Sequence, residues 1–148
     1  MNERTLIIIK PDGVQRRLVG EIIARFEKKG LKIAAARFLQ ISPELAQKHY
    51  AVHKGKDLFD RAVKNLSSGP VLVMVFEGQK VIEITRKMMG ATAGFDALPG
   101  TIRGDFGTSQ TLTLVHGSDS KESAEYEIGL YFKPEEILNY QMADAEWL

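Results

Sequence analysis

His116 is placed for phosphate chemistry, because it ends a short apolar segment of the chain. It is followed by Gly117-Ser118-Asp119-Ser120, a tight turn that leads into an expected helix. The free backbone N–H groups at the start of a helix attract phosphate oxygens, so a histidine beside them is well placed to act on a phosphoryl group. The alternative is a histidine with purely structural hydrogen bonds at a strand end, and this pattern alone leaves both open.

Glu127 is a candidate partner for that imidazole. The expected last helix has an apolar face formed by Ala124, Ile128 and Tyr131. Glu127 lies close to this face, and no basic residue stands three or four positions away from it. A half-buried carboxylate needs a hydrogen-bond donor, and His116 could supply one while keeping its other ring nitrogen free as a nucleophile. The alternative is that the Glu127 side chain extends into water.

Three cations could bind phosphate oxygens. Lys10 ends the first buried strand, and Arg86 and Arg103 flank a glycine-containing loop that also carries Thr92. Guanidinium forks and ammonium groups suit phosphate oxygens, although most such residues are simply exposed cations. The sequence has neither a Walker A loop nor glycines with dinucleotide-binding spacing.

His49 and His53 stand four positions apart, so on a helix they would share a face and could bind a metal ion. No third ligand has a recognisable spacing, and the H-E-x-x-H zinc pattern is absent. We therefore interpret these two residues as surface or half-buried histidines.

The composition predicts one ordinary globular domain over residues 1–148. Hydrophobic residues make up 44% and charged residues 26%, and the net charge is only +1. Such a balance gives no bulk attraction to nucleic acid or anionic lipid, and no apolar run is long enough to span a membrane. The chain has no cysteine and no signal-peptide pattern, which favours a reducing compartment and a cytoplasmic location.

The elements that must position these residues follow from the apolar periodicity. Their order is strand, helix, strand, two helices, strand, helix, strand, helix. This order predicts an α/β protein of the α+β sandwich type, with a ferredoxin-like four-stranded antiparallel sheet and helices packed on it. A doubly wound parallel sheet is the competing topology. Asp119 and Glu122 have capping-box spacing at the start of the last helix. The expected strands cover residues 6–9, 31–41, 71–76 and 112–115, and the expected helices begin near residues 19, 43, 58, 81 and 119.

The sequence resembles the nucleoside diphosphate kinases over nearly its whole length, from Glu3 through Phe132. The strongest match is Val115-His116-Gly117-Ser118-Asp119-Ser120, followed by Glu122-Ser123-Ala124 and Glu127-Ile128. Further matches are Thr5-Leu6-Ile7-Ile8-Ile9-Lys10-Pro11-Asp12-Gly13, Ser68-Gly69-Pro70 and Pro99-Gly100-Thr101-Ile102-Arg103-Gly104-Asp105-Phe106.

This resemblance implies a ferredoxin-like sandwich that assembles into a homo-oligomer, a hexamer or less often a tetramer. It also implies transfer of a γ-phosphate from a nucleoside triphosphate to a nucleoside diphosphate in a ping-pong reaction through phosphohistidine. By position, His116 is similar to the nucleophile, Glu127 to its orienting carboxylate and Ser118 to the partner of that carboxylate. Asp119 is similar to the residue that helps hold Mg²⁺ through water. The residues similar to phosphate and sugar contacts are Lys10, Tyr50, Arg86, Thr92 and Arg103.

Departures from the family pattern cluster at the nucleotide's base and ribose. Leu58 replaces a stacking phenylalanine, and Thr113 replaces an asparagine that meets the sugar hydroxyl. Ala62 replaces a leucine, and Ala93-Gly94 replaces an Asn-Pro pair. We expect intact phosphotransfer residues beside altered base and ribose contacts, although a shifted alignment would let Phe59 stack.

Two other function classes compete with this interpretation. A non-catalytic or weakly active nucleotide-binding regulatory oligomer fits the changes at Leu58 and Thr113, but not the joint retention of His116, Glu127 and the cations. A ferredoxin-like nucleic-acid module would need a basic excess and exposed aromatic residues on its sheet, which this sequence lacks.

Overall fold

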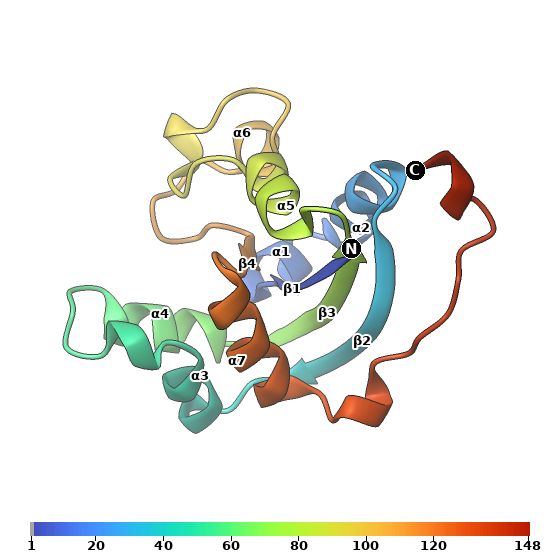
Figure 1. Ribbon diagram of the computed structural model, residues 1–148. Helices are drawn as coiled ribbons and strands as arrows, with labels where there is room; N and C mark the ends of the chain where they lie inside the picture. Colours follow the sequence, from blue (N-terminus) through green and yellow to red (C-terminus); the bar gives the residue numbers. More distant parts are fainter. Residues whose placement is uncertain (1) are drawn as a thin grey trace.

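The sheet has the strand order β2-β3-β1-β4 in the computed structural model, which describes residues 2–148 (Figure 1). Every neighbouring pair of β1 (Glu3–Ile9), β2 (Lys32–Gln40), β3 (Pro70–Gly78) and β4 (Val115–Gly117) runs antiparallel. This arrangement confirms the ferredoxin-like sheet that the sequence predicts, and the doubly wound parallel alternative is excluded.

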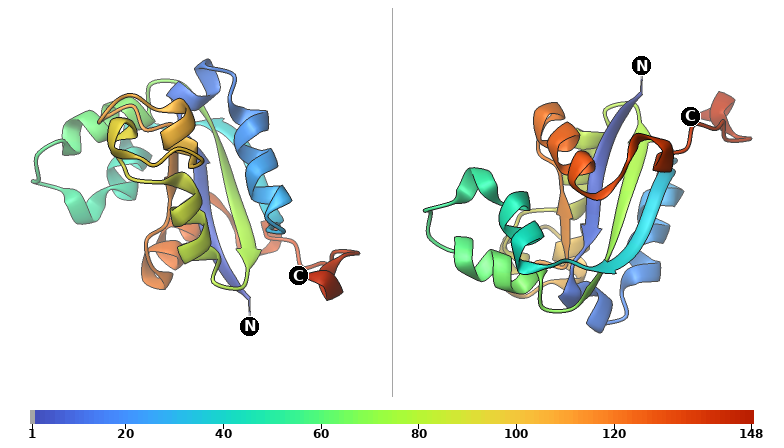
Figure 2. Two further views of the ribbon diagram at one scale, coloured as in Figure 1. Left: turned by 90° about the horizontal axis from the view of Figure 1, so that it is seen from above. Right: turned by 90° about the horizontal axis from the view of Figure 1, so that it is seen from below.

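Helices cover both faces of the sheet (Figure 2). One hydrophobic cluster contains side chains of α2 and α5, and the other contains side chains of α3, α4 and the C-terminal end of α7. No helix within residues 2–148 is long and apolar enough to cross a membrane. The helices are α1 (Pro11–Gln15), α2 (Val19–Lys28), α3 (Pro43–His49), α4 (Phe59–Leu66), α5 (Val81–Met89), α6 (Ile102–Phe106) and α7 (Lys121–Tyr131), with 3₁₀ turns η1 (Ala51–His53), η2 (Gly94–Asp96), η3 (Pro134–Glu136) and η4 (Ala145–Trp147).

The central strand β1 contributes to both hydrophobic clusters. Leu6 and Ile8 point into one cluster while Ile7 and Ile9 point into the other, and all four are fully buried. Because side chains alternate along a strand, this pattern requires a strand covered on both faces, as the unbroken apolar run predicts. β1 therefore fixes the position of Lys10, which follows it directly.

The predicted fourth strand is present, but it covers Val115–Gly117 rather than residues 112–115, because pairing with β1 begins only at Val115. Leu114 has a positive φ of 69°, and its N–H donates to the Asp12 carboxylate at 2.8 Å instead of to a strand. His116 consequently lies in the middle of β4 rather than at its end.

The predicted capping box is also wrong. Ser120, not Asp119, is the N-cap of α7, and its hydroxyl accepts a hydrogen bond from the N–H of Ser123 at 3.1 Å. Asp119 therefore lies one position before the cap. Its side chain is left available to the neighbouring pocket.

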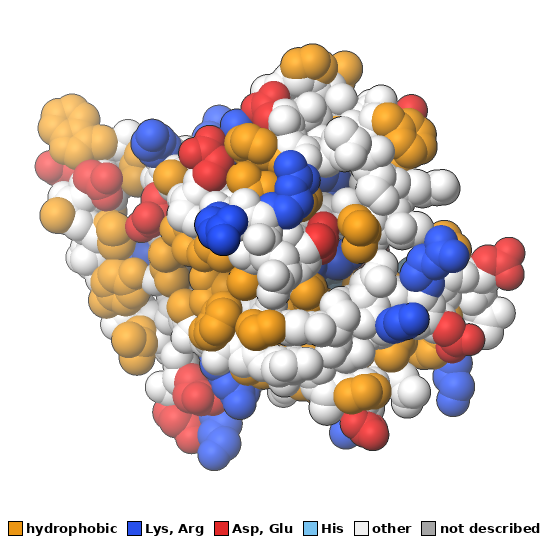
Figure 3. All heavy atoms as spheres, turned by 180° about the vertical axis from the view of Figure 1, so that it is seen from behind, with side chains coloured by type: hydrophobic (Ala, Val, Ile, Leu, Met, Phe, Trp, Pro, Cys, Tyr) orange, Lys and Arg blue, Asp and Glu red, His pale blue; other side chains and the backbone are white. Residues whose placement is uncertain are grey.

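β2 departs from the simple alternation expected for a strand with one wet face. A register shift between Ile33 and Ala35 places Ala34 and Ala35 both in the core, whereas Phe38 is 63% exposed. The C-terminal segment runs beside this strand, since the N–H of Leu138 donates to the carbonyl of Ala34 at 2.9 Å. Hydrophobic side chains gather on one face of the molecule in Figure 3. The exposed large apolar side chains of β2 and the C-terminal segment are Phe38, Leu138, Tyr140, Met142, Trp147 and Leu148.

Candidate active site

Glu127 joins two side chains at the end of the sheet. Its Oε1 lies 2.8 Å from His116 Nε2 and accepts a hydrogen bond from Ser118 Oγ at 2.8 Å. Ser118 is fully buried, and its hydroxyl accepts in turn from the N–H of Leu6 at 3.2 Å. The expected pairing of His116 with Glu127 is therefore present, and Ser118 holds the carboxylate against β1.

This pairing determines which nitrogen of His116 is available. An ionised carboxylate only accepts hydrogen bonds, so Nε2 carries the ring proton that faces Glu127. Nδ1 of the neutral ring then holds a lone pair and has no such partner. A nitrogen in this state is nucleophilic, and an adjacent carboxylate stabilises the cationic ring that forms when it attacks.

Lys10 and Arg103 bring positive charge to the same place without a carboxylate partner. Lys10 Nζ donates to Thr113 Oγ1 at 2.9 Å. Arg103 donates to three backbone carbonyls, those of Gly90, Thr113 and Val115. Among the described residues their direct acceptors are neutral, and the nearby Asp12 carboxylate offsets only part of their charge, which suits both cations to an anionic ligand.

Burial acts on these cations as well. Desolvation lowers the pKa of Lys10, and it lowers the pKa of Arg103 to about 10, with the charge of Arg86 as the next cause. Arg86 itself donates to the carbonyl of Gly117 at 3.0 Å, directly after His116. A bound anion would offset both the cost of removing these cations from water and the repulsion between them.

The residues expected at the site line one pocket of about 530 Å³. Ser118 is the exception, because it lies behind Glu127 in the interior. The sequence therefore predicted a set of side chains that the fold does bring together. Those that line the pocket are Lys10, Tyr50, Leu58, Arg86, Thr92, Arg103, Thr113, His116, Asp119 and Glu127.

The loop between α5 and α6, which carries Thr92, packs against the segment that follows α6. A Cβ built on Gly94 would clash with the backbone of Gly107, so only glycine permits this approach. At the end of the loop, Thr101 caps α6 by accepting from the N–H of Gly104. Arg103 follows in the first turn of that helix, with its guanidinium directed into the pocket.

Leu58 occupies the pocket wall at the start of α4. It has a positive φ of 72°, and 55% of its surface is exposed. Phe59 also lines the pocket, but it packs partly against the hydrophobic core. The geometry thus favours Leu58 over Phe59 as the exposed platform.

Two further groups have defined protonation states. Burial, followed by the charge of Glu127, raises the pKa of Tyr50 to about 12, so its hydroxyl stays neutral and can donate. A hydrogen bond from Ser123 lowers the pKa of Asp119, so this carboxylate is ionised.

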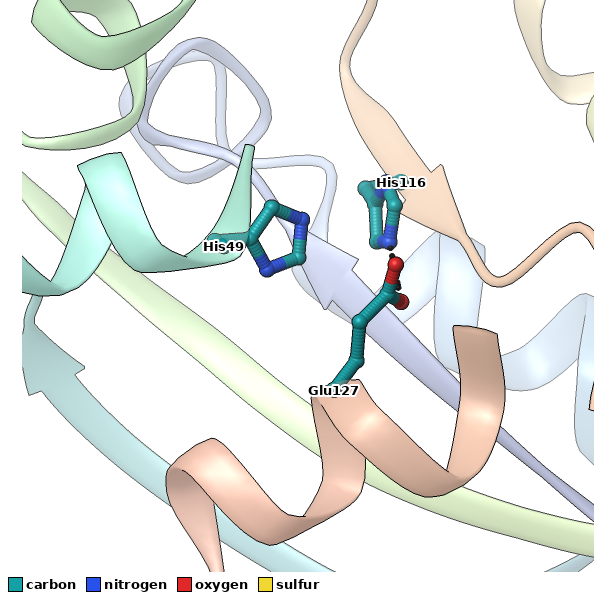
Figure 4. A group of neighbouring side chains, drawn as sticks. All are labelled: His49, His116 and Glu127. Carbon is teal, nitrogen blue, oxygen red and sulfur yellow. Dashed lines mark hydrogen bonds and ion pairs between the residues drawn. The ribbon is translucent and has the colours of Figure 1, made fainter. Parts of the chain in front are cut away.

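His49 belongs to the site, although its sequence context did not reveal this. Its ring centroid lies 4.5 Å from that of His116 with the rings nearly perpendicular, and Figure 4 shows both rings beside Glu127. The alternative in which His49 and His53 share a helical face does not apply, because α3 ends at His49 and His53 lies in η1. His49 is buried at 4% exposure rather than half-buried, and His53 is exposed.

The comparisons with known proteins agree with this geometry. The family model "Nucleoside diphosphate kinase" matches residues 3–137. The chain belongs to the nucleoside diphosphate kinase family. Among its relatives, the nucleoside diphosphate kinase of Pyrococcus furiosus is 57% identical over 148 residues, which cover 98% of this chain and 91% of that protein. That of Bacillus anthracis is 50% identical over 146 residues, or 99% of each.

Solved structures of the nucleoside diphosphate kinase family share the fold. The enzyme of Halobacterium salinarum, solved in complex with CDP, has a TM-score of 0.96 at 45% identity, covering 99% of this chain and 98% of that one. A family member from Babesia bovis has a TM-score of 0.93 at 43% identity, covering 98% of each chain. The resemblance drawn from the motifs is thus confirmed, and with it the expectation of a kinase.

Proposed function

We propose that this protein transfers the γ-phosphate of a nucleoside triphosphate to a nucleoside diphosphate, by a ping-pong mechanism through phosphohistidine at His116. The observation that carries the proposal is the 2.8 Å contact between His116 Nε2 and Glu127, which leaves Nδ1 as the nucleophile. The family membership and the relative solved with CDP support nucleotides as substrates.

The cations supply the charge that phosphoryl transfer needs. Catalysis of this reaction is mostly positioning and electrostatic stabilisation of the phosphoryl oxygens. Arg86 and Arg103 take up the charge on these oxygens while His116 Nδ1 attacks phosphorus in line and the nucleoside diphosphate leaves. The phosphate then passes from Nδ1 to a second nucleoside diphosphate in the same pocket. Glu127 stabilises the cationic ring, and Ser118 holds Glu127.

Asp119 suits Mg²⁺ as a cofactor. Its carboxylate is ionised and lines the pocket beside Arg86. Mg²⁺ prefers one or two carboxylates together with waters and substrate phosphates, so a single Asp119 acting through water fits this ion. When bound, the ion neutralises charge on the nucleotide's phosphates.

The remaining pocket residues bind the nucleotide. Lys10, Tyr50 and Thr92 present an ammonium and two hydroxyl groups to phosphate and sugar. Leu58 offers an aliphatic platform to the base, and Thr113 lies near the ribose. Because apolar contact with a base is tolerant of base identity, the pocket should accept several nucleosides.

The test is a phosphoenzyme assay. Incubation with Mg-ATP alone should leave an acid-labile phosphate on His116, and a different nucleoside diphosphate should then remove it. His116→Ala should form none, whereas His53→Ala, an exposed change nearby, should behave like the wild type. Phosphate on a serine, or transfer without a phosphoenzyme, contradicts the mechanism. A folded protein that binds nucleotide without transfer is instead the non-catalytic regulatory oligomer.

We further propose that residues 1–148 act as one domain in a cytoplasmic homo-oligomer, a hexamer or a tetramer. The absence of cysteine supports a reducing compartment. The exposed Phe38 on edge strand β2 supports self-association, because unpaired edges and apolar patches favour contact with another chain. Sedimentation of the intact chain measures the assembly.

A further inference from the structure

His49 Nε2 is a buried nitrogen without a partner. Within residues 2–148 only two buried side-chain atoms lack a hydrogen bond, and the other is Thr5 Oγ1. Leaving a buried polar atom unpaired is costly, so such an atom in a ligand pocket indicates a missing partner. His49 lines the same pocket as His116 and Glu127. Figure 4 shows its ring facing these two side chains.

The three side chains form a set of metal ligands. One ligand atom from each of His49, His116 and Glu127 lies within 4.8 Å of the other two. The residues come from α3, β4 and α7, so the fold rather than local spacing brings them together (Figure 4). Two imidazoles and one carboxylate are the protein ligands of many zinc sites that keep a fourth position open to water.

The surroundings of His49 suit it to bind a metal ion. Its Nδ1 lies 3.0 Å from Tyr131 Oη. A histidine that binds a metal through one nitrogen usually donates its other N–H to a neighbouring oxygen, which fixes the ring and its tautomer. Tyr131 is that neighbour here.

We propose that the nucleotide-free, unphosphorylated protein binds one Zn²⁺ per chain through His49 Nε2, His116 Nε2 and Glu127. Zn–N and Zn–O bonds are about 2.0–2.2 Å long, so the ligand atoms of a tetrahedral site lie farther apart than the 2.8 Å between His116 Nε2 and Glu127 Oε1. These two side chains therefore separate slightly to admit the ion. This site differs in chemistry from the Mg²⁺ site proposed at Asp119, because imidazole nitrogen favours zinc and related transition metals over Mg²⁺. Binding itself does not depend on the proposed phosphotransfer.

The consequence for the reaction does depend on the proposed function. When the metal occupies Nε2, the proton that this nitrogen shared with Glu127 moves to Nδ1. The ring stays neutral, but Nδ1 loses the lone pair with which it attacks phosphorus. Zinc therefore holds the enzyme in an unreactive state until it is removed.

Metal binding is measured on the full chain without nucleotide. Calorimetric titration with Zn²⁺ should give one site per chain, and Co²⁺ should give the visible absorption of a tetrahedral nitrogen and oxygen site. His49→Gln should weaken Zn²⁺ binding by at least about tenfold, and loss of the outer partner in Tyr131→Phe should weaken it by about 10- to 100-fold. His53→Gln should bind Zn²⁺ like the wild type, since His53 lies outside the cluster.

Several results would overturn the proposal. Equal Zn²⁺ affinity in wild type and a folded His49→Gln variant places the metal elsewhere. If the wild type neither binds Zn²⁺ nor gives the Co²⁺ spectrum, no metal ion binds at His49 Nε2, and water is its partner. If His49→Gln does not fold, the wild-type Co²⁺ spectrum and the Tyr131→Phe titration still decide. Zn²⁺ binding by a protein that forms no phosphohistidine refutes the proposed function and leaves this inference standing.

Discussion

Lys10 donates a hydrogen bond to the hydroxyl of Thr113 at 2.9 Å, across 103 positions of sequence. Thr113 is 6% exposed, and its carbonyl also accepts from Arg103 at 3.0 Å. Thr113 thus holds two of the cations that we propose to bind the phosphates. It therefore acts as a positioning residue for both.

Thr113→Val should weaken nucleotide binding and shift the alkaline limit of activity to lower pH. Valine keeps the shape of threonine but leaves the Lys10 ammonium without its acceptor, which costs about 1.5–3 kcal/mol for a charged group. Burial already lowers the pKa of Lys10, and loss of an acceptor for the charged form lowers it further. The measurement is kcat/KM against pH, and Thr113→Ser should restore the wild-type profile. If the alkaline limb of the kcat/KM profile is unchanged in Thr113→Val, Thr113 does not position Lys10.

Leu58→Phe and Thr113→Asn should tighten nucleotide binding with little change in the maximal rate. A phenylalanine platform restores part of a stacking energy of about 1–3 kcal/mol per base, and an amide reaches further toward the sugar than a hydroxyl does. These contacts are nearly equal in the ground and transition states, so KM changes more than kcat. The two effects should add in the double variant, because the residues contact different parts of the nucleotide. If neither variant binds nucleotide more tightly than the wild type, other residues of this chain make the base and ribose contacts.

Glu127→Gln should slow single-turnover phosphorylation without unfolding the protein. The amide keeps a hydrogen-bonding group beside Nε2 but loses the charge that stabilises the cationic ring. This loss is on the order of 1–3 kcal/mol, or roughly 5- to 150-fold in rate. Glu125→Gln changes an exposed carboxylate on the same helix and should leave the rate unchanged. Equal rates in all three proteins would exclude Glu127 from the chemistry.

The protein should lose stability as the pH falls below about 6.5, and His49 should contribute to this loss. Burial lowers the pKa of His49 in the folded state, so the unfolded chain binds a proton there that the folded chain does not. Acid then favours unfolding until the pH reaches the lowered pKa. Thermal unfolding from pH 8 to pH 5 measures the slope, which should be shallower in His49→Gln than in the wild type, and changed less in His53→Gln, because His53 is only the smallest contributor to the lowered pKa of His49. Equal slopes in all three proteins contradict the prediction.

The sequence predicted what strong local patterns determine. The apolar run at β1 predicted a strand covered on both faces. The helical face around Glu127 made this carboxylate a candidate partner of His116, with a side chain that extends to water as the alternative. The hydrogen bond between Lys10 and Thr113 could not be predicted from the sequence, because it depends on the antiparallel pairing of distant strands. The fourth strand begins at Val115 rather than at residue 112, because Leu114 adopts a positive φ that its residue type does not suggest.

Other features were missed because their local signal is weak. Helices α1 and α6 span five residues each, too few for an apolar period to appear. His49 offered only a spacing to His53, whereas its real neighbour His116 is 67 positions away and comes close through the packing of α3 beside α7. The close backbone contact between Gly94 and Gly107 has no signature in the sequence.

The hydroxyl of Ser118 links the reactive carboxylate to the backbone of Leu6, at the centre of the sheet. Buried central strands exchange their amide protons only when a protein opens globally, whereas loops exchange through local fluctuations. The amide of Leu6 therefore reports the global opening of the sheet that holds Ser118 and Glu127 in place. Deuterium uptake at this one position should track the loss of phosphotransfer on heating, so the contact between His116 and Glu127 should be lost with the whole fold and not before it.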